Sequence, residues 1–139
     1  MNGNLTFTII KPNAVEKNHS GEIINRIENA GFEIKALKKV KLTRCVAEKF
    51  YAVHKDKPFF DSLVSFMSSG PVIVAVLQKD NAVESFRAFI GSTDPAKAAA
   101  GTIRKDFGES IEKNAVHGSD SDENAMIEGN FFFSACERV

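Results

Sequence analysis

The sequence predicts an α+β fold in which one antiparallel sheet of four strands is covered by helices. Apolar and polar residues alternate in LTFTII (5–10) and FEIKALKKVKL (32–42), the period-two pattern of half-buried strands. VIVAVL (72–77) is apolar throughout, as expected of a central strand that is covered on both faces. Apolar residues recur at helical spacing between these runs. The length suits one domain, which we place over residues 1–139.

The first predicted strand, residues 5–10, ends at Lys11-Pro12 because proline lacks the N–H that continued pairing requires. A helix then runs from an N-cap at Ser20 to a stop at Gly31. The second predicted strand spans residues 32–42. Its apolar side chains are expected to share one face of the sheet: Phe32, Ile34, Ala36, Val40 and Leu42.

A pair of helices is predicted next, inserted before the third strand. Thr43 caps the first helix, while Pro58 opens the second and Gly70 closes it. Strand 72–77 and a helix over residues 81–90 follow. Two sets of side chains are expected to face inward from these helices: Val46, Phe50 and Val53, and Val83, Phe86 and Ile90.

Residues 92–114 show weak periodicity, and a segment of this length with so little regular structure is usually functional or disordered. Its turn residues and its arginine favour function. We expect one short helical turn in it, from Asp94-Pro95 to Gly101.

The last predicted elements are a short strand over residues 115–117 and a helix that runs to about Glu128, capped by Ser121 or Ser119. FFF (131–133) is expected to be buried or to form a short edge. Without the inserted helix pair the order of elements is βαββαβ, the ferredoxin-like arrangement.

Charge and composition restrict the classes of partner. Basic and acidic residues balance at 18 each, so there is no overall basic footprint for nucleic acid or an anionic membrane. We expect no secretory signal, and the longest apolar run is too short to span a bilayer. The expected protein is cytoplasmic and not membrane-bound, with Cys45 and Cys136 as free thiols rather than a structural disulfide.

The segment NAVHGSDS (114–121) places His117 beside a glycine, two serines and an aspartate. A neutral imidazole is nucleophilic near pH 7, and one ring nitrogen can attack phosphorus when the other donates a hydrogen bond. Glu128 on the following helix could accept that bond with help from Ser119, and Gly118 would leave space beside the attacking nitrogen. The N-terminus of that helix adds a positive dipole for anionic oxygens. These residues predict phosphate chemistry; alone, they leave open an ordinary structural histidine.

Phosphoryl transfer also needs cations that balance the charge on the transferred group. Three candidates lie at the end of the first strand, on a helix and in the long loop: Lys11, Arg87 and Arg104. Two polar residues beside the loop can donate to phosphate or ribose oxygens: Thr93 and Asn114. Two apolar residues can sandwich a base: Phe59 and Ile111. Each of them, taken singly, is also compatible with a surface, turn or core position.

Five segments carry a more specific signal: TIIKPNAV, FYAVHKDKPFF, SGPVIVAVL, GSTDPAKAAAGTIRKDFG and NAVHGSDS. In residues, order and spacing the chain resembles the nucleoside diphosphate kinase family from Leu5 to about Phe133. The resemblance implies an enzyme that transfers the γ-phosphoryl group of a nucleoside triphosphate, chiefly ATP, to nucleoside diphosphates by a ping-pong mechanism. His117 would carry the group as phosphohistidine, oriented by Glu128 and Ser119.

The same resemblance implies further roles. Six residues match the family's phosphate and ribose contacts, Lys11 being catalytic as well: Lys11, Tyr51, Arg87, Thr93, Arg104 and Asn114. Phe59 matches the residue that stacks on the base, and Ile111 falls where the family has an aliphatic residue on the base's other face. Mg²⁺ is the implied cofactor, held mainly by the nucleotide phosphates, with Asp120 in contact through water. A homo-oligomer, tetramer or hexamer, is expected.

Three residues depart from the family's pattern: Asn13, Ala100 and Gly129. Glycine inside a helix lowers its stability by roughly 1 kcal/mol, so Gly129 bears on the support of Glu128.

The alternative function is a non-catalytic nucleotide-binding regulatory module, which would predict the loss of His117 or of the surrounding cations. The balanced charge argues against nucleic acid as the primary partner.

Overall fold

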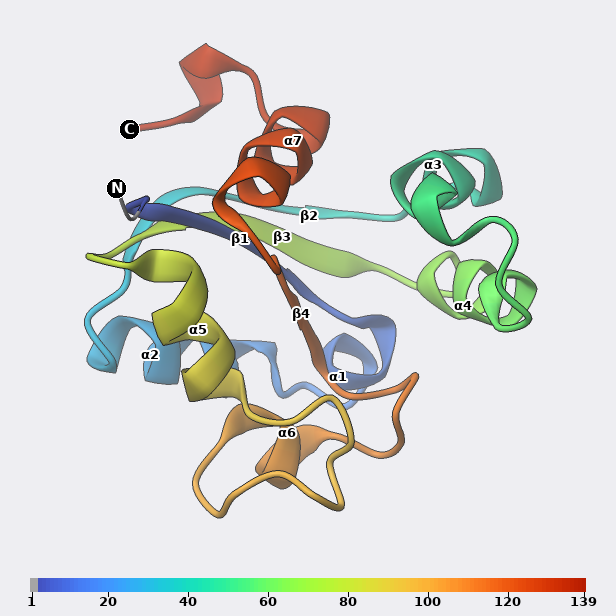
Figure 1. Ribbon diagram of the computed structural model, residues 1–139, viewed down its shortest axis with the longest axis horizontal. Coiled ribbons are helices and arrows are strands. Elements are labelled where there is room, and N and C mark those ends of the chain that lie inside the picture. Colours follow the sequence, from blue (N-terminus) through green and yellow to red (C-terminus); the bar gives the residue numbers. More distant parts are fainter. Residues whose placement is uncertain (1–2) are drawn as a thin grey trace.

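The computed structural model describes residues 3–139, and an antiparallel four-stranded sheet in the order β2-β3-β1-β4 lies at its centre (Figure 1). Its strands are β1 (Leu5–Ile10), β2 (Glu33–Val40), β3 (Val72–Gln78) and β4 (Val116–Gly118). β3 lies between β2 and β1, and all of its residues except the last are buried. The prediction of a central strand there is confirmed.

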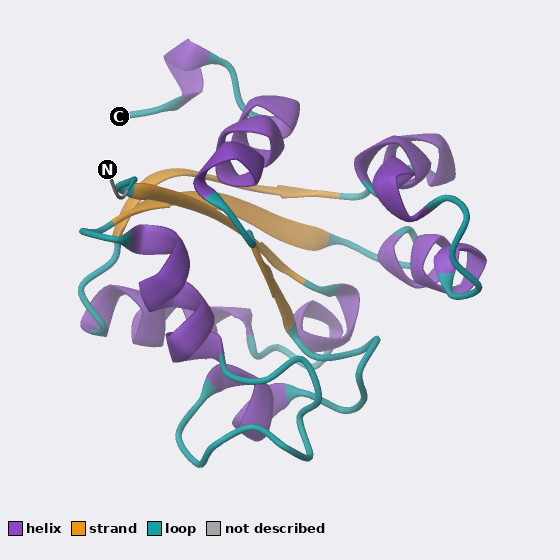
Figure 2. Ribbon diagram, viewed as in Figure 1, coloured by secondary structure: helices purple, strands orange, loops and turns teal. Residues whose placement is uncertain are grey.

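Helices cover both faces of this sheet, as Figure 2 shows. One face carries α1 (Pro12–Glu16), α2 (Ser20–Asn29), α5 (Ala82–Ile90) and α6 (Ile103–Phe107). The other carries α3 (Arg44–Phe50), α4 (Phe60–Met67) and α7 (Asp122–Phe132). Two single-turn 3-10 helices complete the regular structure, η1 (Ala52–His54) after α3 and η2 (Ala135–Glu137) near the C-terminus.

The sheet separates two apolar cores because side chains alternate along each strand. Phe7 and Val74 belong to the core under α3, α4 and α7. Ile73 and Leu77 belong to the core under α2 and α5, together with Phe86. The predicted inward side of the 81–90 helix is confirmed, since its three apolar residues are at most 8% exposed: Val83, Phe86 and Ile90.

The prediction that β2 presents one apolar face is wrong. Ile34 pairs with Leu77, but Ala36 pairs with Val76, so Lys35 is an extra residue in the ladder and forms a β-bulge. Phe32 and Ile34 therefore pack in the core under α2 and α5. The later apolar residues pack in the opposite core: Ala36, Val40 and Leu42. The bulge changes the face without interrupting the alternation of the sequence.

Two short helices escaped the sequence prediction. Pro12 ends β1 as expected but also opens α1, where proline at the first position leaves no helical hydrogen bond unmade. In the long loop the predicted helical turn is present only at its start, where the Lys97 N–H donates to the Asp94 carbonyl at 3.0 Å and the Ala98 N–H to the Pro95 carbonyl at 3.3 Å. The helix in this loop is α6, whose N-cap Thr102 accepts a hydrogen bond from the Lys105 N–H at 3.3 Å.

Other helices begin or end a few residues from their predicted positions. Thr43 and Ser121 are the side-chain caps of α3 and α7, as predicted, whereas Ser20 is the first residue of α2 and caps nothing. Val53 was expected to face inward but lies in η1 with 83% of its surface exposed. The FFF segment is not an edge strand, because α7 continues through its first two phenylalanines and only Phe133 is buried.

The C-terminal residues fold back over the sheet. The Val139 N–H donates to the Lys35 carbonyl at 2.9 Å, beside the bulge, and Lys38 pairs with Glu137 at 2.9 Å. Cys45 and Cys136 are free and exposed, as expected. Within residues 3–139 we find no helix with the length and apolar character needed to cross a membrane.

Candidate active site

His117 lies in the middle of β4, opposite Ile9 of β1. The Thr8 hydroxyl donates to the His117 carbonyl at 2.7 Å and fixes this pairing. Just before the strand, the Val116 N–H donates to the Asn114 carbonyl at 3.0 Å across Ala115, whose φ is 75°. This is a γ-turn with a left-handed central residue, a rare and strained form that holds the start of β4 in one direction.

The protonation of the His117 ring follows from its partner. Its Nε2 lies 2.8 Å from Glu128 Oε1, and the same oxygen accepts from the Ser119 hydroxyl at 2.6 Å. A carboxylate accepts hydrogen bonds, so the ring proton is on Nε2 and Nδ1 keeps its lone pair. The Phe50 ring packs edge-on against the imidazole with centroids 5.8 Å apart. The imidazole is thus held by three side chains in the tautomer that leaves Nδ1 nucleophilic.

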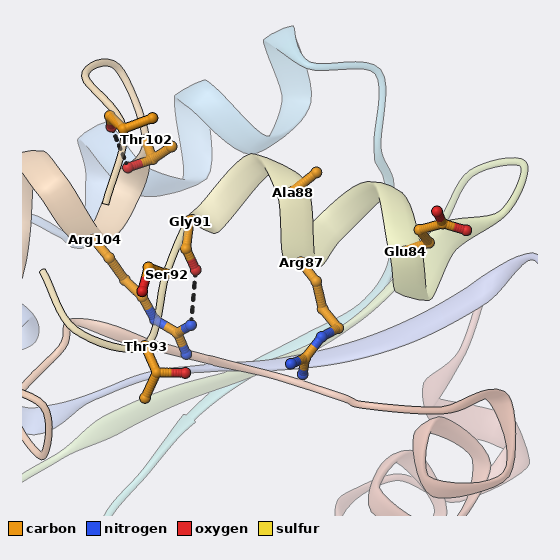
Figure 3. A pocket seen from close by; sticks show the side chains of 9 residues that line it. Glu84, Arg87, Ala88, Gly91, Ser92, Thr93, Thr102 and Arg104 are labelled. Atoms are coloured by element: carbon orange, nitrogen blue, oxygen red, sulfur yellow. Dashed lines mark hydrogen bonds between the residues drawn. The ribbon is translucent and has the colours of Figure 1, made fainter. Parts of the chain in front are cut away.

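The space beside His117 is a cavity of about 490 Å³ between α7, β4, α5 and the segment after α3. Its walls include Tyr51, Arg87, His117, Asp120, Asn124 and Glu128. Arg87 also lines a second cavity of about 620 Å³, with Thr93 and Arg104 (Figure 3). Arg87 thus lies on the wall of both the cavity that holds His117 and the cavity that holds Arg104.

The three predicted cations come together although they are distant in sequence. Figure 3 shows the Arg104 side chain passing below Gly91 toward Thr93. Its two terminal nitrogens donate to the carbonyls of Gly91 and Val116, each at 3.0 Å. Burial, helped by the positive charge of Arg87, lowers the pKa of Arg104 to about 10. Charges that perturb one another in this way lie close together, as an anion site requires.

Lys11 is the most perturbed of these cations. It is only 7% exposed, and burial together with the charge of Arg104 lowers its pKa to about 7. Glu112 acts in the opposite direction but more weakly. The Lys11 ammonium donates to the Glu112 carbonyl at 3.3 Å. A buried, poorly compensated cation at the end of β1 gains stability when an anion arrives.

Several buried polar atoms lie around the cleft, as we call the two cavities together. Within residues 3–139 these atoms have no hydrogen-bond partner: the Tyr51 hydroxyl, Arg104 Nε and Asn114 Oδ1. An unsatisfied buried polar group costs about 1–3 kcal/mol, so each needs an explanation. Burial and the charge of Glu128 raise the pKa of Tyr51, which keeps its hydroxyl proton available for donation. Asn114 already donates to the Thr93 carbonyl at 3.1 Å and thereby joins the two ends of the long loop. A polar ligand would supply the missing partners.

The proposed base-contacting residues lie apart from these cavities. Phe59 precedes α4 and is 47% exposed, and Ile111 lies in the loop before β4 and is 61% exposed. Neither lines the His117 cavity. The Ser62 hydroxyl donates to Glu112 at 3.1 Å, which brings α4 and the Ile111 loop side by side.

Gly118 lines the His117 cavity, as the sequence argument expected, but the space freed by its missing side chain lies on another side. A Cβ on this glycine would lie 3.0 Å from Ile90 Cδ1 and 3.1 Å from Phe86 Cδ2, inside the core under α5. Glycine therefore lets β4 pack closely on α5. Sequence reasoning also missed Phe50 and Asn124, which line the cavity. Asn124 donates to Asp120 at 2.6 Å, and only its spacing of four residues from that aspartate hinted at the contact.

The residues of the cleft do not form a metal cage. In the part of the chain that the structure describes, no three His, Cys, Asp or Glu side chains are grouped to hold a metal ion. Asp120 is exposed and supplies one carboxylate to the cavity wall. Glu128, the other carboxylate on that wall, is engaged by His117 and Ser119. Asp120 alone fits a cation that takes most of its ligands from phosphate oxygens.

Comparison with known proteins decides the family. The profile described as "Nucleoside diphosphate kinase" matches residues 4–138 of this chain. This chain belongs to the nucleoside diphosphate kinase family. A nucleoside diphosphate kinase of Geotalea daltonii is 58% identical over 134 residues, which cover 96% of this chain and 98% of that relative. A nucleoside diphosphate kinase of Campylobacter curvus is 61% identical over 132 residues, 95% of this chain and 96% of that one.

Solved structures of nucleoside diphosphate kinases have the same fold. The enzyme of Aquifex aeolicus superposes with a TM-score of 0.95 at 47% identity, covering 98% of this chain and 99% of that one. The Halobacterium salinarum enzyme, solved in complex with CDP, gives 0.93 at 38% identity, covering 99% and 92%. The ferredoxin-like fold is therefore confirmed, and so is the resemblance.

Membership in the nucleoside diphosphate kinase family establishes the chemistry at the level of the reaction. The protein is a phosphotransferase that acts on nucleotides, and the family needs a divalent cation. The alternative of a non-catalytic regulatory module finds no support among these relatives.

Proposed function

We propose that His117 Nδ1 is the nucleophile of a ping-pong nucleoside diphosphate kinase reaction. The Nδ1 lone pair attacks the γ-phosphorus of a nucleoside triphosphate, the bond from phosphorus to the β–γ bridging oxygen breaks, and the nucleoside diphosphate leaves with that electron pair. A phosphate oxygen of a second nucleoside diphosphate then attacks the phosphohistidine and restores the ring. The observation that carries this proposal is the 2.8 Å contact of Nε2 with Glu128, because it leaves Nδ1 unprotonated.

Glu128 and Ser119 act on the ring rather than on the nucleotide. When Nδ1 gains phosphorus, positive charge develops on the imidazole while Nε2 keeps its proton. The Glu128 carboxylate offsets that charge through the existing hydrogen bond, and the Ser119 hydroxyl holds the same carboxylate oxygen at 2.6 Å. No rearrangement is needed at the moment of transfer.

The cations and donors of the cleft would hold the phosphates and ribose. Lys11, Arg87 and Arg104 balance charge on the transferred group, and Lys11 thereby assists catalysis. The Tyr51 hydroxyl and Arg104 Nε, which lack partners, would donate to ligand oxygens, and Asn114 Oδ1 would accept from a ribose hydroxyl. The residues in this group are Lys11, Tyr51, Arg87, Thr93, Arg104 and Asn114.

Phe59 and Ile111 would contact the base from opposite faces at the cleft's outer edge. Stacking on an apolar surface does not depend on the identity of the base. The site would therefore accept several nucleotides, and the related Halobacterium salinarum enzyme was solved with CDP. ATP is the expected main donor.

Mg²⁺ is the cation we propose. Its ligands would be mainly the β- and γ-phosphate oxygens, with Asp120 reached through water; bound there, it neutralises charge that develops on the phosphates. Of the two carboxylates on the cavity wall, Glu128 is engaged by His117 and Ser119, and this leaves Asp120 for the cation.

We also propose a cytoplasmic homo-oligomer, a tetramer or a hexamer. β2 is an edge strand of the sheet, and its Leu37 is 45% exposed, a feature that subunit contact would bury. Multi-angle light scattering measures the subunit number directly. A monomeric mass would contradict the proposal.

The phosphoryl-carrier role is tested with γ-labelled ATP. The parent protein should take up label in a bond that acid breaks and base does not, as expected of phosphohistidine. His117→Ala should take up none. His19→Ala is the matched control, because His19 lies far along the chain, packed on Phe107 with ring centroids 4.9 Å apart. Equal labelling of the parent and His117→Ala would contradict the mechanism.

A further inference from the structure

The loop over residues 109–113 is built around one carbonyl. The Lys113 carbonyl accepts from the backbone N–H groups of Glu109 at 2.8 Å and Ser110 at 3.3 Å. The Lys113 N–H donates in turn to the Ser110 hydroxyl at 3.1 Å. These bonds close a tight turn with Ile111 at its exposed tip. The position of that tip depends on what anchors the Lys113 carbonyl to the rest of the protein.

The anchor is the side chain of Asn13, on α1. Asn13 is 6% exposed, and its Nδ2 donates to the Lys113 carbonyl at 3.1 Å and to Glu109 Oε2 at 2.8 Å. Both partners are acceptors only, so the amide nitrogen must face them and the flipped amide is excluded. Lys17, also near α1, pairs with the other oxygen of Glu109 at 3.0 Å. One buried amide thus joins α1 to both ends of the turn.

Lys11, the N-cap residue of α1 and a proposed phosphate contact, is tied to the same loop. Lys11 donates through its ammonium to the Glu112 carbonyl at 3.3 Å and through its backbone N–H to the Ala115 carbonyl at 2.8 Å. Together with the Asn13 bond to the Lys113 carbonyl, these contacts tie residues 11–13 to residues 112–115 at three points. A shift of the turn would therefore displace both Ile111 and the carbonyl that orients Lys11.

We propose that Asn13 is a positioning residue for nucleotide binding, whose amide holds the 109–113 turn so that Ile111 and Lys11 are preorganised for the base and the phosphates. The proposal rests on the nucleotide contacts proposed above for Lys11 and Ile111. Asn13 itself does not line the cavity beside the imidazole. Its effect is therefore on affinity and not on the transfer of phosphorus.

Aspartate at position 13 distinguishes this role from a role in α1 itself. Position 13 is the second residue of α1, where an acidic side chain is favourable for a helix. A merely helical role predicts that Asn13→Asp is neutral or stabilising. At the turn the same change replaces an N–H donor with an oxygen that faces the Glu109 carboxylate and the Lys113 carbonyl. Three acceptors without a shared proton repel one another, so the turn must move.

The charged groups around this contact define a pH test. Glu109 contacts Asn13 from the turn, and Lys17 pairs with Glu109 from the chain after α1. The charge of Lys113 also acts on Glu109, and Lys11 lies two residues from Asn13. In Asn13→Asp, the introduced carboxylate and Glu109 can share one proton once the pH is low enough to supply it. ADP binding by Asn13→Asp should therefore recover between pH 8 and pH 5.5 relative to the parent protein. A purely steric defect would not change with pH.

The measurement is calorimetric titration of each protein with ADP and Mg²⁺, which needs no turnover. We expect Asn13→Ala to bind ADP about tenfold more weakly at pH 8, and Asn13→Asp about a hundredfold more weakly. The phosphohistidine label at saturating ATP should reach the parent level in both. Asn29→Asp, on the exposed end of α2, is the matched control for the change in charge and should bind as the parent does.

Two further variants keep the test decisive if Asn13→Asp does not fold. Glu109→Ala removes the partly exposed partner of the same amide and should weaken ADP binding about threefold. Asn13→Asp with Glu109→Gln restores one donor–acceptor pair with its direction reversed and should regain most of the affinity. Parent-like ADP binding by both Asn13→Ala and Glu109→Ala would overturn the proposal. A parent protein that binds ADP but takes up no label would instead contradict the phosphoryl-carrier role and leave the binding comparison valid.

Discussion

Nucleotide binding should draw a proton onto Lys11, and the effect can be measured. The pKa of this lysine is lowered from 10.5 to about 7, first by burial and then by the charge of Arg104. The free protein therefore holds Lys11 about half protonated at pH 7 and about one-tenth protonated at pH 8. Phosphate oxygens in the cleft would favour the charged form. Binding of ADP is then expected to take up about 0.5 proton at pH 7 and about 0.9 at pH 8.

The same linkage sets the pH dependence of affinity. As the pH rises from 7 to 8, the fraction of free protein with a charged Lys11 falls, and ADP affinity should fall about fivefold. The sign for folding is opposite. In the unliganded protein the folded state holds the proton less tightly than the unfolded chain does, so Lys11 makes stability rise as the pH increases from about 7 toward 10.5.

Calorimetric titration with ADP in two buffers of different ionisation enthalpy measures the proton uptake. Lys11→Met removes the titrating group and should abolish the Lys11 share of the uptake at pH 8. Lys11→Arg keeps a permanent charge and should bind ADP with an affinity that does not fall between pH 7 and pH 8. A parent protein without proton uptake at pH 8, or with the same uptake as Lys11→Met, would refute the reasoning.

Two further variants test the support of the imidazole. Glu128→Gln keeps the shape of the side chain but removes the charge that faces Nε2. The single-turnover rate of labelling should therefore fall about a hundredfold, while ADP binding is unchanged. An undiminished rate would argue against the orienting role of Glu128. Gly129→Ala adds a Cβ at 3.4 Å from Val76 Cγ2, which the core can accommodate, and should raise the free energy of unfolding by up to about 1 kcal/mol. Thermal melting measures that gain, and a lowered Tm would mean that α7 needs the closer approach to β3.

The elements that the sequence predicted well are those whose signal is local. Apolar runs, caps such as Thr43 and Ser121, and the isolated prolines and glycines located the strands and most helices because their physical causes act over a few residues. The bulge at Lys35 has no such signal. Period-two alternation continues through it, and only the register against β3 reveals that the apolar side chains change face.

The contacts of the candidate site also divide into those that local spacing in the sequence predicts and those that it does not. His117, Glu128 and Ser119 lie within twelve residues, so their grouping could be expected from spacing on a strand and a helix. The anchoring of Lys113 by Asn13 joins positions 100 apart in the chain and arises only from the packing of α1 beside the long loop. Composition and periodicity hold no information on such a contact. For the same reason the sequence argument placed the space freed by Gly118 beside the imidazole, whereas it lies against α5.

The strained turn at Ala115 depends both on its own backbone geometry and on contacts with residues distant in the sequence. A left-handed alanine costs about 1–2 kcal/mol, and nothing in the residue type favours it. The surrounding structure holds it there, because Ala115 is fully buried and its carbonyl accepts from the Lys11 N–H at 2.8 Å. In return the turn directs the Asn114 side chain to Thr93 and begins the strand that carries His117. Val116, the next residue, accepts from Arg104 at 3.0 Å through its carbonyl, so the direction of the backbone at Ala115 bears on the positions of both the imidazole and Arg104.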